Sequence, residues 1–156
     1  MDDEDLMKKA IDKAREGIAE GQTPFGACIV KDGSVVACEH NTVWKDTDIT
    51  SHAEIHAIRS ACRKLETVDL SGCVIYSTTE PCPMCFSAIH WAGIRKIVFG
   101  TRIEDAKKYG FSELEIPNEK MKELGNSKVE IVSDLLRDEN VKVFEEWAAR
   151  EDKKSY

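Results

Sequence analysis

The sequence predicts an α/β protein, a three-layer α/β/α sandwich built around a central mixed five-stranded sheet. β-type segments alternate with segments of helical periodicity along most of the chain, which is typical of parallel strands joined by helices. The first two β-type segments are separated only by Asp32 and Gly33, a pair that favours an antiparallel hairpin. The chain has 156 residues, 42% of them hydrophobic and 33% charged, so we expect a single domain over residues 1–156.

The predicted elements follow one another regularly up to residue 101. The opening helix is acidic in its first turn, ends at Gly21 and has apolar residues at helical spacing, namely Met7, Ala10, Ile11, Ala14 and Ile18. The hairpin strands are expected at residues 25–31 and 34–39, before a polar loop at 41–50. We then expect a helix over about 51–65, a strand over 73–79, a helix over 82–92 and a strand over 96–100.

The pattern is less regular beyond residue 101. We expect a helix around residues 104–109 and a short strand at 128–132. The chain should close with an amphipathic helix that contains Phe144, Trp147 and Ala148. No internal repeat, low-complexity tract or Gly/Ser linker is visible, so we predict no domain boundary.

The charge and the apolar content of the chain bound its partners. With 22 basic and 29 acidic residues, the formal net charge is −7. This balance disfavours nucleic acid as a partner, because binding to a phosphate backbone depends mainly on lysine and arginine. The longest apolar stretches are too short for a membrane span or a signal peptide. We therefore expect a cytoplasmic protein without a membrane partner, whose six cysteines do not form disulfides.

Two short segments carry side chains suited to chemistry. They are Ser-His-Ala-Glu at residues 51–54 and Glu-Pro-Cys-Pro-Met-Cys at residues 80–85. Each follows a β-type segment and opens a predicted helix, which places both at the carboxyl edge of the strands, where ligands usually bind. Pro83 suits the first helical position and Cys82 the cap before it. The partial positive charge of a helix N-terminus favours the thiolate form of Cys82 and Cys85.

His52, Cys82 and Cys85 form a set of nitrogen and sulfur ligands that suits zinc. Three protein ligands leave one coordination position open, as in catalytic zinc sites, and water bound there has its pKa lowered to roughly 7. Glu54 follows His52 by two residues and is chemically unsuited to completing such a site. We expect Glu54 to carry protons instead, from that water to a ring nitrogen and then to departing ammonia.

Each of these residues also has an ordinary explanation when taken alone. Ser51 and Glu54 have the spacing of a capping box, and a Cys-x-x-Cys sequence is also found in redox pairs. His56, one turn after His52, is assigned to packing or to a partner contact. The other four cysteines have no ligand spacing and are assigned as small buried hydrophobic residues: Cys28, Cys38, Cys62 and Cys73.

Taken together, the residues resemble the His-x-Glu…Pro-Cys-x-x-Cys signature of zinc deaminases. The chain resembles the cytidine deaminase-like superfamily of zinc hydrolases along nearly its whole length, and within it most closely the bacterial guanine deaminase branch. The branch resemblance rests on Pro-Phe-Gly-Ala at residues 24–27, Ala-Ile-His-Trp-Ala at 88–92, the segment from Asp105 to Phe111, and the aromatic C-terminal residues Phe144, Trp147 and Tyr156.

The resemblance implies a pocket for a nucleobase. Asn41 and the backbone of Ala53 would contact the base, while Phe25 and Trp91 would flank its ring. Phe111 would add a further aromatic side chain to this pocket.

The resemblance also implies features outside the zinc ligands. Glu113 stands where the family has a second catalytic acid, an aspartate. Tyr156 would close the pocket of a neighbouring subunit, in a homodimer that exchanges its C-terminal tail, about residues 138–156. Each subunit would hold one zinc ion.

The leading hypothesis is the hydrolysis of guanine to xanthine and ammonia. The alternatives are deamination of the wobble adenosine of tRNA, deamination of cytosine or cytidine, and deamination of a related aminated purine or triazine. A non-catalytic zinc-binding interaction domain is a further alternative, which Glu54 disfavours because a structural site needs no carboxylate beside an open coordination position.

Overall fold

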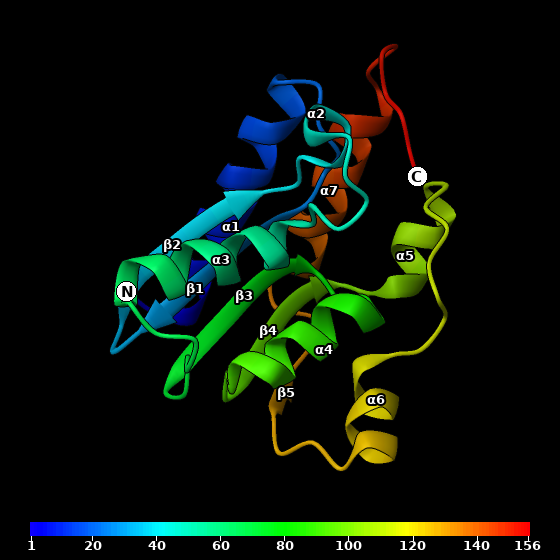
Figure 1. Cartoon of the computed structure of the whole chain (residues 1–156). Coiled ribbons are helices and arrows are strands. Elements are labelled where there is room, and N and C mark those ends of the chain that lie inside the picture. The colour runs from blue at the N-terminus through cyan, green and yellow to red at the C-terminus, as the bar shows by residue number, and fades with distance from the viewer.

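The computed structural model describes residues 1–156 as a five-stranded sheet with helices on both faces (Figure 1). The strands are β1 (Gly26–Lys31), β2 (Ser34–His40), β3 (Cys73–Thr79), β4 (Lys96–Thr101) and β5 (Glu130–Val132). The helices are α1 (Asp3–Ala19), α2 (Val43–Asp46), α3 (Ala53–Leu65), α4 (Pro83–Ala92), α5 (Ile103–Lys108), α6 (Asn118–Gly125) and α7 (Arg137–Ala148). The predicted three-layer sandwich is confirmed.

The direction of the strands decides where the functional segments meet. The strand order is β2-β1-β3-β4-β5. β1 is antiparallel to both of its neighbours, β2 and β3, whereas β3, β4 and β5 pair in parallel. β2, β3 and β4 therefore end at the same edge of the sheet. The segments before α3 and α4 lie at this edge, because they follow β2 and β3 in the chain.

The turn between β1 and β2 needs a left-handed backbone at both of its residues. Asp32 has a φ of 48° and Gly33 a φ of 75°. Such a two-residue turn matches the right-handed twist of paired strands, and glycine adopts it without steric cost. The predicted hairpin is confirmed, with Lys31 and Ser34 as the last pair before the turn.

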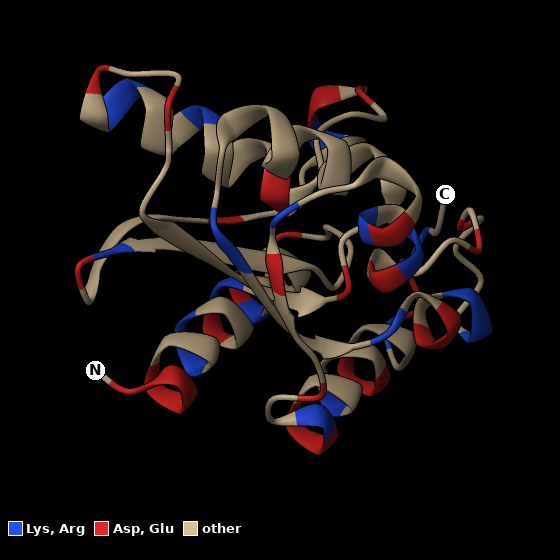
Figure 2. Cartoon of the chain, turned by 90° about the horizontal axis from the view of Figure 1, so that it is seen from below, with Lys and Arg blue, Asp and Glu red and all other residues tan.

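Two pairs of helices cover the two faces of the sheet. α1 packs on β1, β2 and β3 and contacts α7, which packs on β4. On the opposite face of the sheet, α3 packs on β1 and β2 and contacts α4. Figure 2 shows helices on either side of the sheet. All seven residues of β3 are buried between these layers. Since each buried large apolar side chain contributes about 1.5–3 kcal/mol, this central strand is a firm base for the site at its carboxyl end.

Two short helices, α2 and α6, are absent from the sequence prediction. α2 is a single turn whose first backbone N–H, at Val43, donates to the side chain of Asn41. α6 begins at Asn118, whose backbone N–H donates to the Glu80 carboxylate over a separation of 38 residues. Contacts from outside these helices stabilise their first turns, and hydrophobic periodicity does not detect such contacts.

Cys28 and Cys38 form a disulfide between β1 and β2. The expectation that the cysteines are unpaired is wrong for these two, because they are direct partners in the antiparallel register. The sequence pattern predicts both strands but not which residues stand opposite each other. Cys62 and Cys73 are free, as expected, and Cys73 is buried.

The outer surface is mixed in charge. Acidic and basic residues are interspersed on the helices that cover both faces of the sheet (Figure 2). Among the helices, none is both long enough and apolar enough to span a membrane.

Candidate active site

The three predicted zinc ligands meet at the carboxyl edge of the sheet. His52 is the N-cap of α3 and Cys82 the N-cap of α4, with Pro83 in the first turn of α4 as predicted. The Nδ1 atom of His52 lies 3.6 Å from Sγ of Cys82 and 3.5 Å from Sγ of Cys85. All three ligand atoms lie within 4.8 Å of one another.

This spacing fits a zinc ion. Zinc bonds of about 2.0 Å to nitrogen and about 2.3 Å to sulfur, at a tetrahedral angle, put the two ligand atoms about 3.5 Å apart. The hydrogen bond from Cys85, followed by the contact with His52, lowers the pKa of Cys82 to about 4. The same bond to Cys82, together with burial, raises the pKa of Cys85. Zinc takes thiolates, so a dication bound here would displace the protons that these sulfurs hold.

Glu54 lies in the first turn of α3, beside the ligands. Its side chain is buried, and its two carboxylate oxygens face different groups. Oε1 accepts a hydrogen bond of 2.9 Å from the hydroxyl of Ser77, and Oε2 lies 3.5 Å from Sγ of Cys85. Burial raises the pKa of Glu54. The capping-box alternative is wrong, since α3 has its N-cap at His52 and no side chain caps it.

A small chamber opens beside this cluster. Its volume is about 20 Å³, and the residues that line it are Phe25, Asn41, His52, Glu54, Thr79, Glu80, Cys82, Glu113 and Tyr156. A larger groove of about 370 Å³ adjoins it and shares His52, Cys82, Glu113 and Tyr156 with it. The chamber has room for about one water molecule, whereas the groove has room for a small organic ligand.

Tyr156, the last residue, lines both the chamber and the groove. Its hydroxyl accepts a hydrogen bond of 2.7 Å from Nδ2 of Asn41, and its ring centroid lies 5.5 Å from that of His52. The tail that carries Tyr156 packs on its own chain, where the backbone N–H of Ser112 donates to the carbonyl of Tyr156. The exchange of residues 138–156 between subunits is not tested by a single chain and stays a prediction.

Two aromatic side chains, Phe25 and Phe111, pack beside the ring of Tyr156. Phe111 meets Phe25 edge-on at 4.9 Å and Tyr156 at 5.2 Å between ring centroids. Phe25 lines the chamber and Phe111 the groove. These two residues therefore lie where a planar ligand would contact them, and their contact with a base stays a prediction.

Trp91 does not lie at this pocket. Its side chain is 85% exposed, and it lines a separate shallow cavity with Phe86 and Met121. The expectation that Trp91 flanks the bound base is not met within one chain. The physical reason is the length of α4, since six residues from Cys85 to Trp91 advance the helix by about 9 Å away from the site.

Glu113 lies in the chamber, as the resemblance implies. Burial, followed by the negative charges of Cys82 and Glu54, raises the pKa of Glu113 to about 7. A carboxyl group with this pKa can both accept and donate a proton near neutral pH. Ala53 is fully buried between His52 and Glu54, and the contact of its backbone with a base stays a prediction.

Glu80 is a site residue that the sequence analysis did not single out. One carboxylate oxygen accepts from the backbone N–H of Ile103 at 3.0 Å and the other from that of Asn118 at 2.8 Å. Asn118 in turn donates from Nδ2 to the carbonyl of Pro81. Glu80 thus joins the starts of α5 and α6 to the loop that holds Cys82. Its place before the Pro-Cys pair is the only signal in the sequence.

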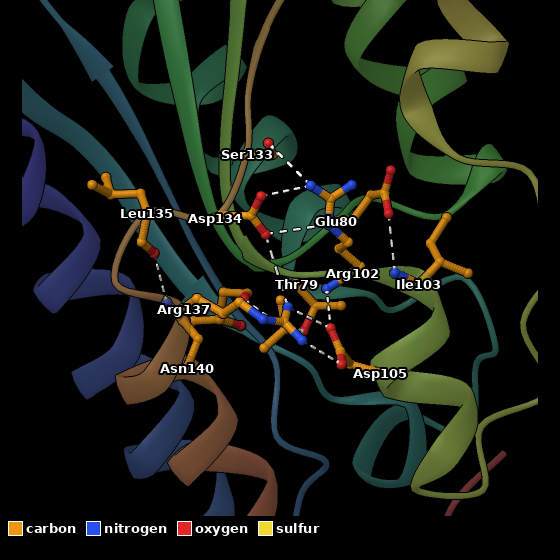
Figure 3. A network of polar contacts seen from close by, with 12 residues as sticks. Thr79, Glu80, Arg102, Ile103, Asp105, Ser133, Asp134, Leu135, Arg137 and Asn140 are labelled. Carbon is orange, nitrogen blue, oxygen red and sulfur yellow. Dashed lines mark hydrogen bonds and ion pairs between the residues drawn. The ribbon is translucent and has the colours of Figure 1, made fainter.

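A second polar network ties the C-terminal segment to α5 (Figure 3). Arg137, at the start of α7, donates to both carboxylate oxygens of Asp105 at 2.7 and 2.8 Å. Arg102 makes a similar pair with Asp134, at 3.2 and 2.5 Å. Asn140 packs directly on Gly100, where a Cβ atom would come within 2.1 Å of its Nδ2. These contacts fix the origin of the tail that ends at Tyr156.

Comparison with known proteins agrees with this geometry. Residues 1–101 match the family described as the cytidine and deoxycytidylate deaminase zinc-binding region. The chain is 37% identical to the guanine deaminase of Bacillus subtilis, over 100% of both chains. It is 36% identical to the tRNA-specific adenosine deaminase of the same organism, over 88% of this chain and 83% of the relative.

The fold of the chain is similar to that of a solved structure. The guanine deaminase of Nitrosomonas europaea superposes with a TM-score of 0.87 at 30% identity, over 96% of this chain and 86% of that one. The family match spans the segments that hold His52, Glu54, Cys82 and Cys85. This chain therefore belongs to the cytidine and deoxycytidylate deaminase family, and it is a zinc-dependent deaminase.

Proposed function

We propose that the chain hydrolyses guanine to xanthine and ammonia. The observation that carries this proposal is the buried carboxylate of Glu54 beside a His-Cys-Cys cluster, at the floor of a chamber closed by aromatic side chains. The choice of guanine is supported by the likeness to a guanine deaminase over the full length of both chains.

The chain's own residues supply the binding and the proton transfers. His52, Cys82 and Cys85 would hold the zinc, which when bound lowers the pKa of water to roughly 7. Glu54 takes one proton from the attacking water and delivers it to a ring nitrogen of the base, where it stays; it then takes the second proton from the hydroxyl added at the carbon and delivers it to the leaving amine. The products are the oxo base and ammonia, so that one water is consumed and no net proton is released. Positioned proton transfer of this kind contributes about 10²–10⁴ in rate.

The opposite side of the chamber orients the base. Oδ1 of Asn41 accepts from the backbone N–H of Val43, which leaves Nδ2 to donate into the chamber. Tyr156 receives that bond in the ligand-free chain. A purine does not fit in about 20 Å³, so Tyr156 must withdraw before the base reaches Asn41 and Glu54. Glu113 also lines the chamber, and we propose that it shares the proton transfers with Glu54.

The main alternative substrate is the wobble adenosine of tRNA. Its support is the 36% identity to a tRNA-specific adenosine deaminase. The net charge of −7 and the interspersed surface charges oppose it, because a tRNA-binding surface needs a basic patch. Cytosine, cytidine and other aminated purines or triazines are further candidates.

Ammonia release from a panel of substrates tests the proposal. The purified protein is incubated with guanine, guanosine, cytosine, cytidine, adenine, 2,6-diaminopurine, the triazine melamine and a tRNA with adenosine at the wobble position. We expect turnover of guanine to exceed that of the other substrates. Turnover of the tRNA alone would overturn the choice of guanine, and turnover of none would overturn the proposed reaction.

We further propose a homodimer with one zinc ion per subunit. Trp91 is 85% exposed on α4, and a second copy of the chain would cover this large apolar side chain. Sedimentation velocity and zinc analysis of the same sample test both parts. A monomeric species with full activity would overturn the dimer, and a zinc content well away from one per chain would overturn the stoichiometry.

A further inference from the structure

Ser77 is a buried hydroxyl that touches the proton carrier of the site. It lies near the carboxyl end of β3 and is 2% exposed. Its Oγ atom lies 2.9 Å from Oε1 of Glu54 and 2.6 Å from the backbone oxygen of Thr79. None of the roles assigned above involves this residue, although it is the side chain that holds Glu54 from the side of the sheet.

A serine hydroxyl has one proton, so it cannot donate to both of these oxygens at once. The bond to the Glu54 carboxylate is the charge-assisted one, and the backbone oxygen of Thr79 is the alternative acceptor. Ser77 therefore lies between its own strand and Glu54, and its hydroxyl has no other side-chain partner at the site.

The contact also gives the two carboxylate oxygens of Glu54 different surroundings. Oε1 is held against β3 by Ser77, while Oε2 faces the ligand cluster at Cys85. Only Oε2 is then turned toward the place where water and base react. A carboxylate without this contact can rotate about its terminal bond, because that torsion is broad.

We propose that Ser77 is a positioning residue that holds the Glu54 carboxylate through Oε1 and keeps Oε2 turned toward the substrate. This inference rests on the proposed function, since it assigns Glu54 the transferred proton. Ser77 does not touch the substrate itself and acts through Glu54. Outer contacts of this kind at metal sites change activity by about 10–100-fold when they are removed.

The test compares Ser77→Ala, Ser77→Thr and the control Ser60→Ala. The Ser60 hydroxyl also donates to a glutamate carboxylate, that of Glu39 at 2.8 Å, but it lies outside the pocket. We expect Ser77→Ala to lower kcat for guanine by about 10–100-fold with KM changed by about twofold or less. Ser77→Thr keeps the hydroxyl and should recover most of kcat, and Ser60→Ala should retain it.

Zinc content separates positioning from a structural role. Ser77→Ala should bind as much zinc as the unsubstituted protein, and assays well below its thermal midpoint keep the variant folded, because losing this buried hydrogen bond lowers stability by about 1–3 kcal/mol. An unaltered kcat in zinc-loaded Ser77→Ala, with guanine turnover intact in the unsubstituted protein, would overturn the role of Ser77 alone. An unsubstituted protein that deaminates no base would overturn the proposed function and this inference with it.

Discussion

The active-site chamber has two sides that are built in different ways. On the metal side, His52, Cys82, Cys85 and Glu54 come from two helix starts, with 30 residues between His52 and Cys82. On the tail side, Asn41 meets Tyr156 over a separation of 115 residues. The metal side is held at the carboxyl ends of β2 and β3, the two strands that flank β1, whereas the tail side depends on how the last helix packs. Substitutions on the metal side should therefore lower the rate of the chemical step, whereas substitutions on the tail side should weaken the binding of the substrate.

Loss of the metal is expected to have the largest effect. Removal of zinc by a chelator should abolish turnover, because the carboxylates of the chamber accept a proton but do not lower the pKa of water as the metal does. Cys85→Ser should lose both zinc and activity, since a serine hydroxyl does not replace a thiolate. Zinc analysis and ammonia release, before and after zinc is added back, measure both effects. Full turnover in the metal-free protein would contradict the assignment of the metal side.

Substitution of Tyr156 in the tail should have a smaller effect, and this effect should appear mainly in KM. After it withdraws from Asn41, we expect the ring of Tyr156 to pack on the bound base. Tyr156→Ala removes this aromatic contact of about 0.5–1.5 kcal/mol, so KM for guanine should rise by up to about tenfold with a smaller change in kcat. Steady-state kinetics over a range of guanine concentrations separates the two parameters. If Tyr156→Ala lowers kcat as much as a substitution of Glu54 does, then Tyr156 takes part in the chemical step. That result would contradict the distinction between the metal side and the tail side.

The anchor of the tail should affect stability more than chemistry. Arg137→Met leaves the largely buried Asp105 without its guanidinium partner, which should cost about 1–3 kcal/mol of unfolding free energy in urea. Arg150→Met removes a partner from the exposed Asp152 and serves as the matched control, with a change near zero.

The same pair predicts a pH dependence. Arg137 holds the pKa of Asp105 below its usual range. The stabilisation is therefore present above the unfolded pKa of about 3.9 and is lost as the pH falls through the lower folded pKa. The stability difference between the unsubstituted protein and Arg137→Met should shrink between about pH 6 and pH 3. A difference that stays constant over this range would exclude the ionised Asp105 as its cause.

Trp91→Ala should have the smallest effect on the pocket of its own chain. Because Trp91 lies outside the chamber and the groove, KM for guanine should change by about twofold or less. A tenfold rise in KM would instead place Trp91 at the pocket of a partner subunit. Weaker self-association of the variant would support the proposed dimer.

The difference between the two sides also explains what the sequence could predict. The zinc ligands and Glu54 lie in two short segments whose spacing, together with the alternation of helices and strands, predicts their meeting place. The fold class, the hairpin turn and the limits of β3 follow from equally local patterns. Glu113 and Tyr156 came from resemblance, and the structure places both in the chamber.

What could not be predicted depends on register and long-range contact. The Cys28–Cys38 bond needs the pairing of β1 with β2, which alternation alone does not give. Glu80 and Ser77 are ordinary polar residues until α6 and α3 pack against them. Trp91 lies outside the pocket of its own chain, because a motif fixes its position along α4 but not the face of the molecule on which it is exposed, and its contact with a base stays a prediction.

The most direct test of the central claim is guanine turnover by Glu54→Gln with zinc measured in the same sample. The amide keeps the size of the side chain and one oxygen that can accept from Ser77, but it cannot carry the proton. We predict zinc content equal to that of the unsubstituted protein and a fall in kcat of about 10²–10⁴. Undiminished ammonia release from the zinc-loaded variant would contradict the assignment of Glu54 as the proton carrier.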